Sequence, residues 1–357
     1  MKTEMTNLPE EIIFDVLSRL PVVSLCRFRC VSKPWRSLIS HPSFIKTHLN
    51  RNTDKNTNKY ERVVLSDHRN WYTVELDSSQ FRHHSVAVRL NFPPGQNPRY
   101  CEEICYSCDG LVLMLDRRFH CCLVNPSTRE SRKLPLSPFT SHPGFTDYGF
   151  GYDSSIDDYK VVNICYYDEE ADTGSAGNVV SVYALKTNSW RRIENSPYDH
   201  SCFGHHSGAF VCGALHWVAS KGMDDVIVAL VLADEKFQTL PSPAPDCIGA
   251  LLCVLRGCLC VFVQQFNPYC LEVWVMKEYG VKDSWMKFTV TYDNIYDSWR
   301  PLSLSRTGQV LLKAHGKNLV LFDPREEESK ELVVQGLPTQ FEVGTYVEIL
   351  VSPKRQC

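Results

Sequence analysis

Two stretches of this 357-residue chain contain residue types suited to metal chemistry. His200-Ser-Cys202-Phe-Gly-His205-His206 places ligand-like side chains close together, and Cys101, Cys105 and Cys108, followed by Cys121-Cys122, could supply thiolates for zinc. Neither stretch has the paired spacing that is typical of a structural zinc site. The first is equally well interpreted as a solvated loop and the second as cysteines of apolar strands, so we predict that the chain binds no metal.

Other patterns associated with catalysis are incomplete. Gly149-Phe-Gly151 lacks the third glycine and the following helix of a dinucleotide-binding loop, so we interpret it as a turn. His83-His84 is interpreted as part of a polar loop. No Ser/His/Asp set or carboxylate pair can be picked out from spacing. The sequence therefore predicts a non-catalytic protein without a cofactor, and the elements that remain to be explained are those that bind other molecules.

The N-terminal residues carry more apolar surface than so short a stretch can bury. Helical spacing of apolar residues, with Pro9 in the first turn, predicts a helix from Pro9 to Leu20, which Pro21 ends. A second short helix is expected from Val23 to Cys30, and a third from the apolar spacing of Val31, Trp35, Leu38 and Ile39. A unit of about 40 residues without disulfides or metal rarely forms a stable core alone. We therefore interpret it as a docking module.

The order of these residues resembles an F-box of the plant type. The matching segments are Leu8-Pro-Glu-Glu-Ile-Ile13, Leu17-Ser-Arg-Leu-Pro21 and Leu25-Cys-Arg-Phe-Arg-Cys-Val-Ser-Lys-Pro-Trp-Arg-Ser-Leu-Ile39. The resemblance implies binding to the Skp-type adaptor of a cullin-RING ubiquitin ligase. The positions that match adaptor contacts are Leu8, Pro9, Leu20, Pro21, Leu25, Val31 and Trp35, whereas Ile13, Val16 and Leu17 fit the small core equally well. The alternative is a helical cap on a larger domain.

Composition changes after the helices. Residues 1 to 60 contain ten Lys and Arg against five Asp and Glu, and the remaining residues carry a formal charge of −8. No basic, aromatic-laced stripe follows, so we do not expect nucleic-acid binding.

Without a signal peptide or a long apolar run, the sixteen cysteines indicate free thiols and a soluble protein of the cytoplasm and/or nucleus, with no membrane insertion. We predict an F-box domain at residues 1–48, a polar linker at 49–59 and one large domain at 60–357.

The large domain has the composition of strands and contains a repeat. Trp190, Phe237 and Trp285 follow equivalent strand and turn patterns and are 47 and 48 residues apart, a period that is typical of kelch-type propeller blades. We predict a kelch-like all-β propeller of about six blades, in which the terminal run Tyr346 to Val351 completes the first blade and closes the ring. The usual kelch double glycine is missing, which leaves the blade number open, and a pair of β-sandwiches is the alternative.

Further segments resemble the F-box-associated domain of the same plant family, which includes S-locus pollen F-box proteins and regulators of immune-receptor abundance. They include Ser107-Cys-Asp-Gly-Leu-Val112, Asn125-Pro-Ser-Thr-Arg-Glu130, Gly149-Phe-Gly-Tyr-Asp153 and Gly208 to Trp217. The resemblance implies a substrate-recognition adaptor of an SCF-type ubiquitin ligase. A propeller with its own small-molecule or enzymatic site in the channel, localised by its F-box, is the alternative. Charged side chains that converge on the channel would favour the alternative.

Long inter-strand loops are the candidates for binding the target protein, because strands are consumed by sheet pairing. The predicted candidates are Asp168, Glu169, Glu170 and Asp172 of an acidic insertion, and His205 and His206 of a polar stretch. An insertion that binds no partner is the alternative for the acidic segment.

Overall fold

The computed structural model describes residues 9–52, 61–76, 84–140, 146–167, 177–200, 207–243, 249–266, 268–292, 299–314 and 318–354. It begins with four helices: α1 (Glu10–Leu17), α2 (Val22–Phe28), α3 (Lys33–Ser40) and α4 (Pro42–Asn52). Pro9 and Pro21 precede α1 and α2, where a residue without an N–H is tolerated, and their carbonyls accept the first helical hydrogen bonds. Ser32 caps α3, because its Oγ accepts a hydrogen bond from the Trp35 amide. Within these ranges no helix combines the length and the apolar content that a membrane crossing requires.

Helix α4 is an addition to the three predicted helices and continues to Asn52, beyond the predicted boundary at residue 48. The Phe44 ring meets that of Phe14 in α1 edge to face, with centroids 5.1 Å apart. The His48 Nε2 lies 3.0 Å from the Leu20 carbonyl oxygen. The buried face of α4 includes His48 and Asn52. Because these two residues are polar, the spacing of apolar residues in the sequence does not reveal this helix. Helix α4 thus packs against α1 and the residues that follow it. Residues 53–60 of the predicted linker lie outside the described residues.

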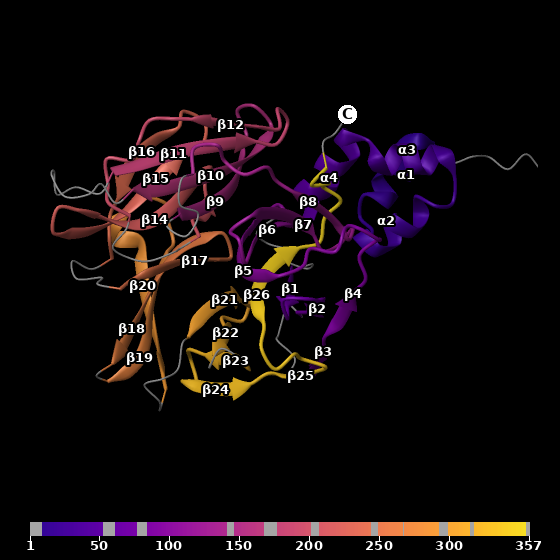
Figure 1. Cartoon of the computed structure of the whole chain (residues 1–357). Coiled ribbons are helices and arrows are strands. Elements are labelled where there is room, and N and C mark those ends of the chain that lie inside the picture. Colours follow the sequence, from indigo (N-terminus) through magenta and orange to yellow (C-terminus); the bar gives the residue numbers. More distant parts are fainter. Residues whose placement is uncertain are drawn as a thin grey trace, which may run out of the picture.

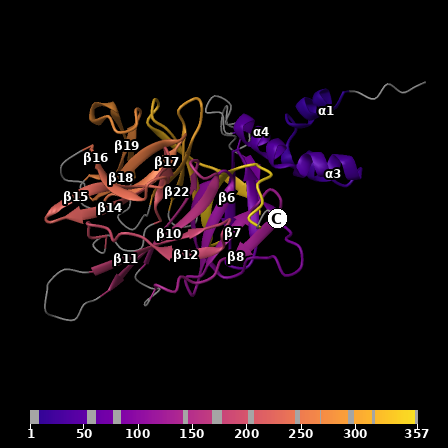
Figure 2. The ribbon, with the colours of Figure 1, turned by 90° about the horizontal axis from the view of Figure 1, so that it is seen from above.

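In the described part of the chain, six four-stranded antiparallel sheets form a propeller, shown in Figures 1 and 2. The first three blades are β26 (Glu342–Val347), β1 (Glu61–Ser66), β2 (Trp71–Glu75) and β4 (Val88–Leu90); β5 (Cys101–Cys108), β6 (Leu111–Asp116), β7 (Cys121–Asn125) and β8 (Glu130–Lys133); and β9 (Thr146–Asp153), β10 (Asp158–Tyr167), β11 (Gly177–Ala184) and β12 (Ser189–Arg192). The other three are β13 (Ala209–Val211), β14 (Ala214–Lys221), β15 (Asp224–Val231) and β16 (Lys236–Leu240); β17 (Leu251–Leu255), β18 (Cys258–Phe266), β19 (Tyr269–Met276) and β20 (Trp285–Thr291), with the 3₁₀ turn η2 (Lys282–Ser284) before β20; and β21 (Arg300–Leu304), β22 (Val310–Ala314), β23 (Asn318–Asp323) and β24 (Glu328–Glu331). Outside the blades, β3 (His84–Val86) pairs in parallel with β25 (Val333–Gln335). The prediction of a small helical domain followed by a propeller of about six blades is confirmed.

The ring is closed by strands from opposite ends of the propeller sequence. The first strands contact one another in the cyclic order β26, β5, β9, β13, β17 and β21. Strand β26 pairs with β1, with Tyr346 opposite Arg62, and Figure 1 shows the yellow C-terminal strand beside the indigo N-terminal one. The closing strand is Glu342–Val347, so it starts before the predicted run. Residues Ile349, Leu350 and Val351 instead join the core that includes the helical module.

Glycines on first strands allow neighbouring blades to approach closely. A Cβ at Gly149 of β9 would lie 2.8 Å from Leu215 Cδ1 and 2.8 Å from Trp217 Cζ2, both in β14 of the next blade. The repeat aromatics lie in fourth strands, where Trp190 Nε1 donates to the carbonyl of Pro135 and Trp285 Nε1 to that of Pro241, each just after the last strand of the preceding blade. The glycines and aromatics of these strands therefore pack blade against blade. The prediction that Gly149-Phe-Gly151 forms a turn is wrong, because these residues lie within β9 (Thr146–Asp153), where the missing side chains admit the next blade.

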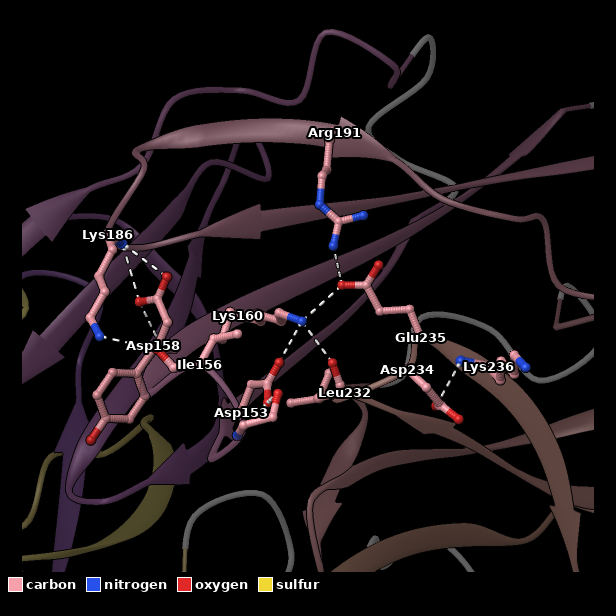
Figure 3. Close-up of polar contacts among 12 residues, drawn as sticks. Asp153, Ile156, Asp158, Lys160, Lys186, Arg191, Leu232, Asp234, Glu235 and Lys236 are labelled. Atoms are coloured by element: carbon pink, nitrogen blue, oxygen red, sulfur yellow. Dashed lines mark hydrogen bonds and ion pairs between the residues drawn. The ribbon is translucent and has the colours of Figure 1, made fainter.

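A buried lysine links the third and fourth blades (Figure 3). Lys160 Nζ lies 2.7 Å from Asp153 Oδ2 and 2.8 Å from Glu235 Oε1, and it donates to the Leu232 carbonyl at 2.7 Å. Arg191 also contacts Glu235. Burial raises the pKa of both carboxyls, but the hydrogen bonds from these cations outweigh it and hold each pKa below its ordinary value. The lysine thus ties β10 to the turn between β15 and β16.

Candidate docking surface and propeller cavities

The helical module leaves apolar side chains in contact with water. Large apolar residues with 46% or more of their surface exposed are Ile12, Val16, Val23 and Val31. Leu17, Val22 and Leu25 turn inward and are buried. Because α1 has two apolar rows at i, i+4 spacing, Ile13 with Leu17 and Ile12 with Val16, only one row can face the small core. The row of Ile12 and Val16 remains on the surface of the module.

The predicted adaptor contacts divide between surface and core. Pro9, Pro21 and Val31 are exposed, and Leu20 and Trp35 are half-buried, with the Trp35 ring edge to face against Phe28. Leu25 is fully buried, so in this structure it supports the helices from inside. Leu8 lies outside the described residues.

The sequence pattern does not single out Ile12 and Val23 as surface residues, and it fits Val16 to the small core as well as to the surface. The sequence signal that could have identified Ile12 and Val16 is the second apolar row of α1, because a helix that buries one row against the small core leaves the other exposed. Whether these side chains contact an adaptor stays a prediction.

The module is fixed to the propeller through α4 and the residues that follow β26. Ile45 of α4 belongs to the same buried cluster as Leu350 and Val351. Asn52 Nδ2 donates to the Glu348 carbonyl at 3.2 Å, and Lys46 Nζ lies 3.4 Å from Asp157 Oδ1 in the β9–β10 turn. Both views show the helices gathered at one side of the propeller. The two parts therefore share one core.

The described ends of the acidic insertion lie far from the turn that meets the helical module. Helix α4 meets the β9–β10 turn, and β10 runs away from this turn to Tyr167, a strand of ten residues that spans about 30 Å. The acidic insertion connects Tyr167 to β11, which begins at Gly177. Its residues Asp168, Glu169, Glu170 and Asp172 lie outside the described residues, as do His205 and His206.

The candidate metal ligands that the structure describes are engaged in the fold, whereas Cys202, His205 and His206 lie outside the described residues. The cysteines concerned are buried in strands, namely Cys101, Cys105, Cys108, Cys121 and Cys122. Burial raises the thiol pKa at each of them, which disfavours the thiolate that zinc binds. His200 is buried beside Ser196, with 2.8 Å between Nε2 and Oγ, and burial lowers its pKa to about 4. Within the described ranges no three His, Cys, Asp or Glu side chains form a metal-binding group.

Charged side chains converge on the central channel. A cavity of about 250 Å³ among β5, β17, β21 and β26 is lined by Glu61, Arg256 and Arg300. A second, of about 110 Å³, shares Arg300 and adds Glu103. Ser303 Oγ donates to Glu61 Oε2 at 2.9 Å, and burial raises the pKa of Glu61 to about 7, against the opposing effects of Ser303 and Arg256. The cavity wall thus carries Glu and Arg side chains beside apolar ones, and this convergence of charged groups is the condition that favours a small-molecule site.

Comparison with known proteins identifies both parts. The model of the F-box domain matches residues 5–47, and that of the F-box associated beta propeller domain matches residues 61–351. F-box protein CPR1 of Arabidopsis thaliana is 33% identical over 97% of this chain and 89% of its own length. Two further proteins of that plant are similar: F-box protein At3g07870 is 30% identical, over 94% of this chain and 90% of its own, and F-box/kelch-repeat protein At3g23880 is 29% identical, over 97% and 96%. The chain belongs to the family of F-box proteins with an F-box associated beta propeller domain.

Proposed function

We propose that the chain is the substrate-recognition subunit of an SCF-type cullin-RING ubiquitin ligase, acting without catalysis of its own in the cytoplasm and/or nucleus. The F-box binds a Skp-type adaptor, and propeller loops hold the protein to be ubiquitinated. The observation that carries this proposal is the exposed apolar set on a helical module that shares its core with the propeller. Exposed apolar residues gathered on so small a module are typical of a protein interface.

The geometry suits a subunit that holds two partners apart. Adaptor binding would occur on α1 to α3, and target binding on loops at the other end of strands such as β10. Because α4 packs into the common core, the fold fixes the position of the helical module relative to the described part of the propeller. A target would then be held in a defined place relative to the ligase.

The adaptor surface is tested by Val16→Asp together with Val31→Asp, whose side chains are 54% and 65% exposed. Interface anchors contribute about 2 kcal/mol or more each, so losing two should weaken binding about a thousandfold and abolish co-purification with a Skp-type protein. Leu8→Ala with Pro9→Ala should act in the same direction. Val88→Asp is the matched control, since Val88 is 55% exposed on β4 of the propeller. Unchanged capture by both double variants would refute the docking assignment.

Target binding is tested by replacing residues 168–176 with a short Gly-Ser turn. Gly177 and Asn178 are kept, because Asn178 Nδ2 donates to the Ser196 carbonyl and belongs to β11. We expect lower capture of target proteins and unchanged Skp-type adaptor binding. Neutralising the four acids, Asp168, Glu169, Glu170 and Asp172, should also weaken target capture. Added salt should do the same, because both reduce the attraction to a basic surface on the target. Neutralising Glu326, Glu327 and Glu331 around β24 is the control, and His205→Ala with His206→Ala tests the neighbouring stretch. Equal capture and turnover for all variants would assign recognition to other loops.

A channel ligand is the second candidate function, favoured by the two arginines that line the larger cavity. Such cations suit a small carboxylate. We expect succinate to raise the melting temperature of the wild-type chain, and the double variant Arg256→Gln, Arg300→Gln to lose this effect. Lys221→Gln, on an exposed lysine at the end of β14, is the control. If succinate stabilises wild type and double variant equally, the arginine site is refuted.

A further inference from the structure

A cleft separates α4 from the ends of the second and third blades. Its volume is about 480 Å³, and its walls come from α4, the β9–β10 and β11–β12 turns and the residues after β26. Small-molecule sites commonly have volumes of 300 to 1,000 Å³ and occur preferentially where two structural units meet. The position is distinct from the exposed face of α1 and from the channel.

The inner surface of the cleft is apolar and aromatic. Ile45, Leu49 and Leu185 contribute aliphatic surface. The rings of Tyr152 and Tyr159 lie beside them, with centroids 5.1 Å apart. Such a surface favours a ligand with a flat or hydrophobic body.

The charged groups at the cleft are three lysines and three aspartates. Lys46, Lys186 and Lys354 line it. The exposed carboxylate of Asp157 lies 3.4 Å from both Lys46 Nζ and Lys186 Nζ. The side chains of these two pairs are all more than half exposed, so the pairs contribute little and can be rearranged.

The other two carboxyls at the cleft are occupied by the fold. Asp109 Oδ2 accepts a hydrogen bond from Tyr159 Oη at 3.0 Å. Asp158 accepts from the backbone amides of Tyr159 and Lys186. Burial raises the pKa of both carboxyls, which reduces their tendency to carry charge. Asp157 is thus the exposed carboxylate among the three and is shared by Lys46 and Lys186, whereas Lys354 Nζ lies 3.8 Å from Glu130 Oε1.

We propose that this cleft binds a small amphipathic organic acid, whose apolar or aromatic body lies against Leu49, Leu185 and the tyrosine rings and whose acid group faces Lys46 and Lys186. Such a ligand contacts α4 and the propeller at once. It therefore stabilises their arrangement, because it binds only when both walls are in place. The site would regulate how firmly the helical module is held on the propeller, independently of adaptor binding.

The experiment titrates the full chain with three probes of the same ring size at pH 7.5: 2-naphthoate, 2-naphthamide and 2-naphthylmethylammonium. We expect 2-naphthoate to bind at least fivefold more tightly than the amide, and the ammonium compound most weakly. Lys46→Gln with Lys186→Gln should erase the preference for the acid while amide binding persists. Lys221→Gln with Lys282→Gln, at exposed positions away from the cleft, is the matched control.

Filling the cleft tests the location of the site. Leu49→Trp and, separately, Ser352→Trp should weaken 2-naphthoate at least tenfold, with folding checked by circular dichroism, and hydrogen exchange of α4 should slow when wild type binds the probe. If neither tryptophan variant folds, the lysine variants still decide the matter. Equal affinity for acid and amide, tryptophan variants that bind like wild type, or no binding of any probe at millimolar concentration would each overturn the proposal.

Discussion

Replacing the buried lysine between the third and fourth blades gives a direct test of what holds neighbouring blades together. In Lys160→Met the aliphatic chain is kept and the ammonium is lost, so Asp153, which is nearly inaccessible, loses its cationic partner. Removing one member of a buried ion pair typically costs 3 to 5 kcal/mol, because a buried charge is left without compensation. Glu235 keeps Arg191, so we expect a loss near the lower limit, about 3 kcal/mol.

The matched control is Lys186→Met, in the same blade. Lys186 Nζ also contacts an aspartate, Asp157, but both side chains are more than half exposed, so the expected loss is below about 1 kcal/mol. For a chain of this size each kcal/mol lowers the melting temperature by about 2 °C, which predicts a shift of about 6 °C for Lys160→Met and less than about 2 °C for the control. Urea unfolding followed by tryptophan fluorescence measures the same difference as a free energy.

The dependence on pH distinguishes charge from packing. The pKa values of Asp153 and Glu235 are held below their ordinary values, so the stabilisation from these groups is present above those ordinary values of 3.8 and 4.5 and is lost as the pH falls through the lowered ones. The gap between wild type and Lys160→Met should therefore be full at pH 7 and shrink below about pH 4. A gap no larger than that of Lys186→Met at pH 7, or one that persists undiminished in acid, would refute the reasoning.

Three further outcomes are expected. Deleting residues 342–357 removes the strand that pairs with β1 and the residues that pack against α4, so size-exclusion chromatography should show aggregates, and a soluble monomer of unchanged melting temperature would contradict ring closure. Gly149→Ala places a Cβ 2.8 Å from Trp217 Cζ2 and should cost about 1 to 3 kcal/mol in urea unfolding, whereas an unchanged midpoint would show that the blades can move apart freely. Because the pKa of Glu61 is raised to about 7, this group opposes folding increasingly as the pH rises from about 4.5 to 7, so Glu61→Gln should gain melting temperature relative to wild type at pH 8 and gain less at pH 5. Equal gains at both values would exclude titration of Glu61 as the cause.

The fold class could be predicted from local patterns. The prolines before α1 and α2 fix where helices start, because a proline lacks the N–H that a first turn does not use. The spacing of Trp190, Phe237 and Trp285 indicated the blades, since each repeat places an aromatic residue in the same strand. Such signals depend on residues that are close together in the chain, so they can be read without knowing the tertiary structure.

The sites depended on contacts between distant residues. Nothing in the sequence around Ile12 and Val16 distinguishes the exposed row of α1 from the buried one, because the choice is made by α4 packing on the other side. The closing strand lies earlier than predicted, since Ile349 to Val351 are used by the helical module.

Likewise, Glu61 and Arg300 are more than 200 residues apart in the sequence, and only ring closure brings them to one cavity. The amino-acid pattern by itself determined helices, strands and the repeat, whereas the tertiary structure decided which apolar and charged side chains meet. The physical reason is that burial and charge pairing are properties of surfaces formed by several elements at once.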